Sequence, residues 1–220
     1  MPTRVQISSF VAFTIGLWLL ILWAQGEPVL SARFLQPFSA VVGAVVVVVL
    51  FFNFVAWPWA IWRGWYVNRP DLRGTWRVTL RSNWNADRIG AEVTEVEAYA
   101  VIRQSLTTLS IRLLTSESRS QLVAHSIELE PDGLYRVAGV FRNEPRVELQ
   151  GVRSEIHHGA LLLEVHGTPP TSLEGHYWTD RMTRGSMAFS GRRRELASAF
   201  ADARAMFSTT GHPMDQPAGA

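Results

Sequence analysis

The chain contains no cysteine and no lysine. The absence of cysteine excludes disulfide bonds and thiol chemistry and leaves the redox compartment undetermined. Every basic side chain is an arginine, which can bind phosphate through two parallel hydrogen bonds. Charge is also absent from two long stretches near the N-terminus, residues 5–25 and 34–62. From residue 63 onward 19 arginines face 18 acidic residues, and this near-neutral balance does not support a broad nucleic-acid surface.

Catalytic motifs are missing as well. The sequence has no glycine-rich phosphate loop and no nucleophile elbow. Several histidines invite a metal hypothesis, but none has a recognised ligand spacing, so we interpret them as solvated or structural. They are His125, His157, His158, His166 and His176. Glu174 and Asp180 alternate with Tyr177, which is typical of surface charges on a strand. We therefore expect a protein that is not an enzyme and that holds no metal and no cofactor.

The two charge-free stretches predict membrane-spanning helices. A helix needs about 20 apolar residues to cross about 30 Å of hydrocarbon, and each stretch is long enough. We place the spans at about residues 5–25 and 37–62, in a helical hairpin that occupies residues 1–66. The connector is too short for a domain and contains Gly26 and Pro28, which break helices.

Arginines flank the hairpin more densely than its connector. Arg4 precedes the first span, Arg63 and Arg69 follow the second, and the connector has one arginine and one glutamate. The positive-inside rule then predicts that both termini are cytoplasmic. A cleaved signal peptide is the alternative interpretation of the first span, and it is disfavoured because the apolar run is long and ends without a small-x-small site.

Residues 67–194 have the pattern of a small antiparallel β-barrel. Residues 74–82 place Trp76, Val78 and Leu80 on one face, with the period of two that a half-buried strand requires. Seven further short runs follow, separated by turn signals, at residues 98–105, 109–115, 121–129, 134–142, 160–167, 174–180 and 185–192. Eight strands in this order predict a lipocalin-like barrel, of a size that can hold one small ligand.

Residues 195–220 differ from the strands before them. The sequence 192–207 has a helical composition, and we expect a short helix that could cap the barrel, with a frayed tail as the alternative. The last twelve residues, 209–220, are predicted to be disordered.

Several polar residues of the predicted strands could bind a ligand. Tyr177, Thr179 and Arg181 share one strand face, and they offer a stacking ring, a hydroxyl and a bidentate phosphate fork. Arg103 shares its face with Tyr99 and Val101, so it is a candidate charge inside the barrel, whose partner is either an internal glutamate or a ligand phosphate. Ser118 and Ser120 could line a barrel mouth or form a plain hairpin turn.

The order of these pieces resembles a known family, the SMODS-associating two-transmembrane, β-strand-rich effectors of bacterial CBASS anti-phage systems. The stretches that carry the resemblance are the N-terminal helix pair and residues 69–78, 98–122, 135–145 and 173–187. The last of these, with its G-x-Y-x-T-x-R…G pattern, is the most specific. Together they cover most of the chain to about Arg194.

The resemblance implies a cytosolic eight-stranded barrel that binds a cyclic dinucleotide made by a cognate nucleotidyltransferase. It further implies that the protein then forms homo-oligomers in the bacterial inner membrane, disrupts the bilayer and kills the infected cell. DNA and RNA are not expected partners. Carried over by position, the candidate ligand-binding residues are Arg103, Gln104, Ser118, Ser120, Asn143, Tyr177, Thr179, Arg181 and Gly185.

Two other functions remain open from the residues alone. A membrane-tethered carrier of a lipid or apolar metabolite would have a barrel interior without charges. A passive membrane scaffold would use the barrel for protein contacts only and would not permeabilise the membrane. Arg103→Ala and Arg181→Ala would leave ligand binding by a carrier intact, and expression toxicity would distinguish a membrane-disrupting protein from a scaffold.

Overall fold

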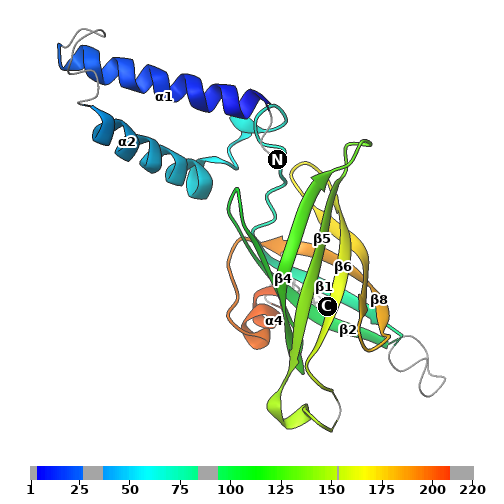
Figure 1. The fold of residues 1–220 in the computed structure, drawn as a ribbon. Coiled ribbons are helices and arrows are strands. Elements are labelled where there is room, and N and C mark those ends of the chain that lie inside the picture. The colour runs from blue at the N-terminus through cyan, green and yellow to red at the C-terminus, as the bar shows by residue number, and fades with distance from the viewer. Residues whose placement is uncertain (1–3, 27–36, 84–93, 153, 209–220) are drawn as a thin grey trace, which may run out of the picture. The chain divides into compact units, whose positions relative to one another are not determined.

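A computed structural model describes residues 4–26, 37–83, 94–152 and 154–208 of the chain. It contains two units, one formed by residues 1–68 with 105–107, and the other by residues 69–104 with 108–220. The predicted architecture is confirmed: two apolar helices precede a closed antiparallel barrel of eight strands (Figure 1). We describe each unit by itself.

The first unit contains the helices α1 (Arg4–Ala24) and α2 (Phe38–Phe51), and α2 continues as one π-helical turn, η1 (Phe52–Ala56). Residues 5–24 and 38–56 are long and apolar enough to cross a membrane. The helical run ends at Ala56, earlier than the expected span boundary at residue 62. Pro58 explains this end, because proline has no N–H for the helical ladder and disfavours helical backbone in the residue before it.

After Pro58 the chain forms a short 3₁₀ turn, η2 (Ala60–Trp62), inside a cluster of aromatic rings. The ring of Phe52 contacts Trp62 and Tyr66 edge-on, with centroids 5.4 and 5.6 Å apart. Gln6 donates a hydrogen bond of 2.6 Å from Nε2 to the Tyr66 carbonyl. These contacts tie the start of α1 to the segment that follows α2.

Eight strands form the barrel, each hydrogen-bonded to its neighbours in sequence, and β1 pairs with β8 to close it. Their bounds are β1 Gly74–Ser82, β2 Thr94–Gln104, β3 Leu109–Leu114, β4 Ser118–Leu129, β5 Tyr135–Pro145, β6 His157–His166, β7 Ser172–Thr179 and β8 Arg184–Arg193. All eight strands lie where the alternation of the sequence predicts them.

The inward face of β1 begins the core, as the pattern predicts. Trp76 and Val78 are fully buried and Leu80 is nearly so, whereas Arg77 and Arg81 on the opposite face are exposed. Apolar residues from the other strands complete one cluster, which includes Ile102, Val137, Leu163, Leu173 and Phe189. This cluster fills one end of the barrel and supports the wall around the other end.

Two predicted turns are in fact strand. Residues 118–120 start β4 and residues 143–145 end β5, with Ser120 paired to Asn143. The turn itself is confined to residues 115–118, where the Thr115 hydroxyl accepts a 2.9 Å hydrogen bond from the Ser118 N–H. Polar composition indicated a loop, but these side chains alternate about an extended backbone and half of them point inward.

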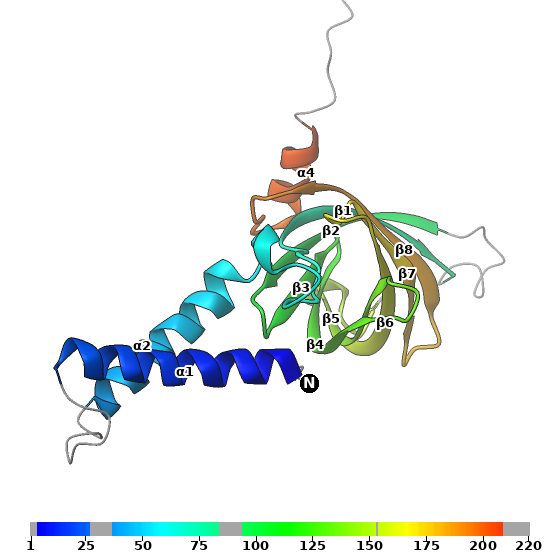
Figure 2. The same cartoon turned by 90° about the horizontal axis from the view of Figure 1, so that it is seen from above.

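The C-terminal helix α4 (Phe200–Ser208) is shorter than expected, because β8 continues to Arg193. It packs on the outside of the barrel against Tyr99, Val101 and Leu114, and does not cap an opening. Figure 2 shows α4 beside β1 and β2, across the barrel from β5 and β6. The predicted disorder of residues 209–220 lies outside the described residues.

Candidate ligand-binding site

One end of the barrel contains a cavity of about 280 Å³. Its floor is apolar, and Leu80, Leu161, Met187 and Phe189 form part of it. Each strand contributes the end that lies farthest from Gly74, where the chain enters the barrel. The cavity therefore opens at the end opposite the segment that leads in from the apolar helices.

A belt of small polar side chains lies above this floor. Its described members are Ser82, Thr94, Thr115, Ser118, Ser120, Asn143, Thr179 and Thr183. Ser120 donates a 2.8 Å hydrogen bond to Asn143 Oδ1, which leaves the amide NH₂ as a donor for other groups. The two hydroxyls of Thr179 and Thr183 are 2.5 Å apart and close the β7–β8 turn. These groups can match the hydrogen-bonding edges of a base or a sugar.

Among the described residues, Arg181 is the arginine that lines the cavity. It belongs to the β7–β8 turn, and its backbone N–H donates to Thr179 Oγ1 at 3.3 Å. Its Nη1 donates a 2.7 Å hydrogen bond to Ser154 Oγ, a residue of the β5–β6 connection. The backbone of Arg181 is therefore fixed by its own turn, and its guanidinium is bound to the β5–β6 connection. A fixed guanidinium at the rim of a partly apolar cavity is suited to a phosphate.

Two aromatic rings, Phe141 and Tyr177, line the cavity wall in a T-shaped arrangement with centroids 6.5 Å apart. Burial raises the pKa of Tyr177, and its hydrogen bond with Ser82 opposes that shift in part. The phenol is consequently neutral at physiological pH and remains a hydrogen-bond donor. Both rings offer surfaces on which a base can stack.

Each ring lies against a glycine of the neighbouring strand. A Cβ on Gly159 would approach Phe141 Cζ to 2.4 Å, and one on Gly185 would approach Tyr177 Cε1 to 2.7 Å. Gly159 pairs with Phe141 and Gly185 pairs with Tyr177 in the register. The two glycines thus let the rings lie close to the wall and leave the centre of the barrel open. Gly185, predicted as a ligand contact, lies against Tyr177, and a Cβ at this position would also come within 2.1 Å of the Arg81 carbonyl oxygen.

The structure gathers six of the nine sequence-predicted residues around the cavity: Ser118, Ser120, Asn143, Tyr177, Thr179 and Arg181. Gly185 lies behind the ring of Tyr177. Arg103 and Gln104 lie away from the cavity.

Arg103 is exposed on the outer face of β2. Its strand neighbours Tyr99 and Val101 are buried beneath α4, which explains why the face they share looked like a core face in the sequence. The expectation that Arg103 lies inside the barrel is therefore wrong.

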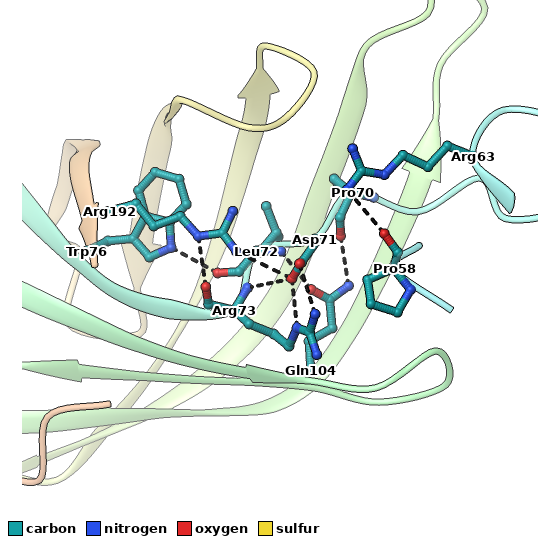
Figure 3. A network of polar contacts seen from close by, with 9 residues as sticks. All are labelled: Pro58, Arg63, Pro70, Asp71, Leu72, Arg73, Trp76, Gln104 and Arg192. Atoms are coloured by element: carbon teal, nitrogen blue, oxygen red, sulfur yellow. Dashed lines mark hydrogen bonds and ion pairs between the residues drawn. The ribbon is translucent and has the colours of Figure 1, made fainter. Parts of the chain in front are cut away.

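Gln104 is buried at the opposite, closed end of the barrel (Figure 3). Its Oε1 accepts a hydrogen bond from Leu72 N and its Nε2 donates to the Pro70 carbonyl, both at 2.9 Å. The amide therefore substitutes for a strand neighbour and fixes residues 69–73, which we call the lead-in segment. Gln104 therefore stabilises the lead-in segment and lies away from the cavity.

Charged groups complete the closed end. Asp71 accepts two hydrogen bonds from Arg73, at 2.8 and 3.0 Å, and lies 3.4 Å from Arg192 Nη2. Burial alone would raise the pKa of Asp71, but the bonds and charges of Arg73 and Arg192 outweigh it and hold that pKa below its usual value. Arg192 also donates to the Arg73 carbonyl and lies over the Trp76 ring, 5.5 Å from its centroid. A ligand could not enter from this end without breaking these contacts.

Sequence reasoning missed several residues of the cavity. Phe141 and the hydroxyl side chains of Thr115, Ser154 and Thr183 line it, as do Glu117 and His157 at the mouth. Phe141 could have been found, because it lies two residues before Asn143 on the same face of β5. Ser154 gives no local signal, since a connection outside any strand brings it to the mouth.

Among the described residues no group of three or more histidine, cysteine or acidic side chains is arranged to hold a metal ion. The cavity instead combines an apolar floor, a belt of hydroxyls and amides, two aromatic rings and one fixed arginine. These features define a receptor for a small polar ligand that carries both rings and an anionic group.

Residues 67–191 match the model of a family described as Cap15, cyclic dinucleotide receptor domain. The match covers more than half of the chain, and the chain belongs to this family, a receptor family of CBASS effectors, as the sequence resemblance predicted. No curated protein matches the chain. The two apolar helices precede the matched region.

Proposed function

We propose that this protein is a membrane-anchored sensor of a CBASS defence system, whose barrel binds a cyclic dinucleotide in the cavity described above. The observation that carries the proposal is Arg181, held at the mouth of a cavity that also contains Phe141 and Tyr177, in a domain of the Cap15 family. A cyclic dinucleotide has two phosphates and two bases, so it can use an arginine, aromatic rings and hydroxyls together.

The shape of the cavity supports one orientation of the ligand. Its volume of about 280 Å³ is just below the roughly 300–1,000 Å³ range of small-molecule sites. A cyclic dinucleotide would fill it and extend to the mouth. We place one base against the aromatic rings and the hydroxyl belt, and a phosphate at Arg181, where solvent remains close to the second nucleotide.

In this proposal the two apolar helices carry out the response to ligand binding. In our proposal they hold the protein in the bacterial inner membrane with both termini in the cytoplasm, where the nucleotide is made. Ligand binding is followed by assembly of homo-oligomers and disruption of the bilayer, and the infected cell dies. Binding can drive assembly only if the assembled form has the higher affinity for the ligand.

A titration tests the binding step. Cyclic dinucleotides of different base composition are titrated into the full chain in nanodiscs at fixed salt concentration. We expect saturable binding of at least one, and a loss of about 1.5–3 kcal/mol, or about 10- to 100-fold in affinity, for Arg181→Gln, because a charge-assisted contact disappears.

Arg103→Gln is the matched control, since this arginine is exposed on the outer face, and it should bind like the wild type. No binding of any cyclic dinucleotide, or equal losses in the two variants, would contradict the proposal. A carrier of an apolar ligand is disfavoured by the polar belt and by Arg181, and it would bind equally well after Arg181→Gln.

A further inference from the structure

The outer faces of β5, β6 and β7 form a continuous surface that the described residues leave uncovered. Alternate residues of these strands point into the core, so the others point outward. The register aligns the outward residues in four rows: Arg136–Glu164–Glu174, Ala138–Leu162–His176, Val140–Ala160–Trp178 and Arg142–His158–Asp180. We call this surface the β6 face. It lies across the barrel from α4 (Figure 2).

The middle two rows of the β6 face are accessible and, apart from His176, apolar. Val140 is 44% exposed and Trp178 is 48% exposed, and the ring of Trp178 stacks on His176 with centroids 5.8 Å apart. Ala160 and Leu162 lie between them on β6 and are half-buried. Contiguous apolar side chains rimmed by charges mark an interaction surface rather than ordinary exposed residues.

The charges of the β6 face are arranged symmetrically about β6. On one side β5 presents Arg136 and Arg142, and on the other side β7 presents Glu174 and Asp180 at the same two levels. A two-fold axis along β6 would bring β5 of one copy opposite β7 of the other. Arg136 would then face Glu174 of the second copy, Arg142 would face Asp180, and each Val140 would face a Trp178. Within its own barrel Arg136 also pairs with Glu130 and Glu164, and Arg142 pairs with Glu144. Glu164, which would face its symmetry mate near the axis, therefore has the charge of Arg136 beside it in each copy.

We propose that the β6 face is the surface through which two copies of this chain associate, around a two-fold axis along β6. An isologous contact requires a patch that is complementary to itself, and these rows meet that condition in both charge and apolar character. The inference rests on the proposed function, whose assembly step it assigns to a particular surface.

The curvature of the barrel fits this contact. Two convex walls touch first along their central strands, where small side chains such as Ala160 allow close approach. Farther out, the long side chains of Arg136, Arg142 and Trp178 can span the widening gap. Buried aromatic and arginine side chains are the residue types that dominate binding energy at interfaces.

The direction of the axis is compatible with a shared membrane. Rotation about β6 leaves the strand direction unchanged, so β6 runs the same way in both copies. Both cavity mouths then lie on one side of the dimer and both lead-in segments on the other. The opposite pairing, with strands reversed, would send the two lead-in segments, and the chain that joins them to the preceding helices, to opposite sides of the dimer.

Disulfide crosslinking tests the proposal, because the natural chain has no cysteine. Ala160 lies on the proposed axis, and a disulfide requires Cα atoms about 4.4–6.8 Å apart. The full chain with Ala160→Cys is reconstituted in vesicles, exposed to a cyclic dinucleotide that binds it, and oxidised. We expect a ligand-dependent dimer band. Ala188→Cys is the matched control, exposed on the outer face of β8, and it should give no band above background.

A second variant separates assembly from binding. Trp178→Ala should raise the protein concentration needed for ligand-induced assembly at least tenfold, as measured by light scattering, with ligand affinity unchanged in the titration. The β6 face would not be the dimer interface if the protein assembles without a crosslink at Ala160, or if Trp178→Ala assembles like the wild type. Either result would leave the proposed function unaffected. Ligand binding without any assembly would contradict both the proposed interface and the assembly step of the proposed function.

Discussion

Arginine side chains have different roles at the two ends of the barrel: one lines the cavity at the open end, and two form ion pairs at the closed end. At the open end, Arg181 is held by Ser154 with its guanidinium lining the cavity, which suits it to an incoming phosphate. At the closed end, Arg73 and Arg192 are committed to Asp71. Because the chain has no lysine, sequence composition alone does not separate these roles, and only the contacts of each side chain do so.

Asp71→Asn tests the closed end. The pKa of Asp71 is lower in the folded protein than the value of about 3.9 expected when unfolded. The stabilisation from the carboxylate is therefore full above about pH 4 and is lost as the pH falls through the lowered folded value. We expect Asp71→Asn to lose about 2 kcal/mol of unfolding free energy at neutral pH.

The measurement is thermal unfolding of the detergent-solubilised full chain, followed by near-ultraviolet circular dichroism at several pH values. Glu95→Gln is the control, because its ion pair with Arg81 is exposed on both sides and should contribute little. A deficit of Asp71→Asn that is as large at pH 3 as at pH 7 would show that the ion pairs are not its cause.

Gln104→Leu separates the closed end from the cavity. The change leaves the Leu72 N–H and the Pro70 carbonyl without their partner, at a cost of about 3 kcal/mol. Ligand affinity should stay within about twofold of the wild type, because Gln104 does not line the cavity. Gln121→Leu, on the exposed face of β4, controls for the substitution itself. If Gln104→Leu lost much of its ligand affinity while its stability stayed unchanged, Gln104 would belong to the ligand site, contrary to this prediction.

At the scale of elements, the strands were predictable and the helix ends were not. Alternation located all eight strands, because each has one face in the core, as Trp76, Val78 and Leu80 show for β1. The same rule misplaced Arg103, since β2 is covered on its outer face by α4 and both of its faces look apolar. A strand covered by a helix has apolar residues on both faces, so its local pattern does not show which face points into the barrel.

The cavity was predictable only in part for a related reason. Residues on the strands, such as Tyr177 and Thr179, follow from the period of two. Ser154 and Gly159 depend on which segments meet at the mouth, and that is set by the register between strands. The second helix ends before the predicted span boundary at residue 62, because apolar composition continues past Ala56 whereas Pro58 ends the helix.

The helix α4 provides a prediction at this scale. Phe207 is buried, stacks on Tyr99 with centroids 5.4 Å apart, and lies beneath the guanidinium of Arg77. Phe207→Ala should lower the unfolding free energy by about 3 kcal/mol. Ligand affinity should not change, because α4 packs outside the barrel and away from the mouth. Leu196→Ala, at a partly exposed position, is the control. A tenfold change in affinity would instead make α4 part of the ligand site.

At the scale of the whole molecule, a receptor domain and two apolar helices are joined by a few residues. The lead-in segment is fastened to the closed end by Gln104, Asp71 and Arg192. The apolar core continues from there to the cavity floor, because Trp76 and Phe189 belong to one cluster.

The release of a trapped dye from vesicles that contain the full chain tests the central claim most directly. The account predicts release only after a cyclic dinucleotide is added outside, to barrels that face outward, with the wild type and Arg103→Gln behaving alike and Arg181→Gln requiring about 10- to 100-fold more ligand. Release that does not depend on the nucleotide, or saturated binding without any release, would contradict it.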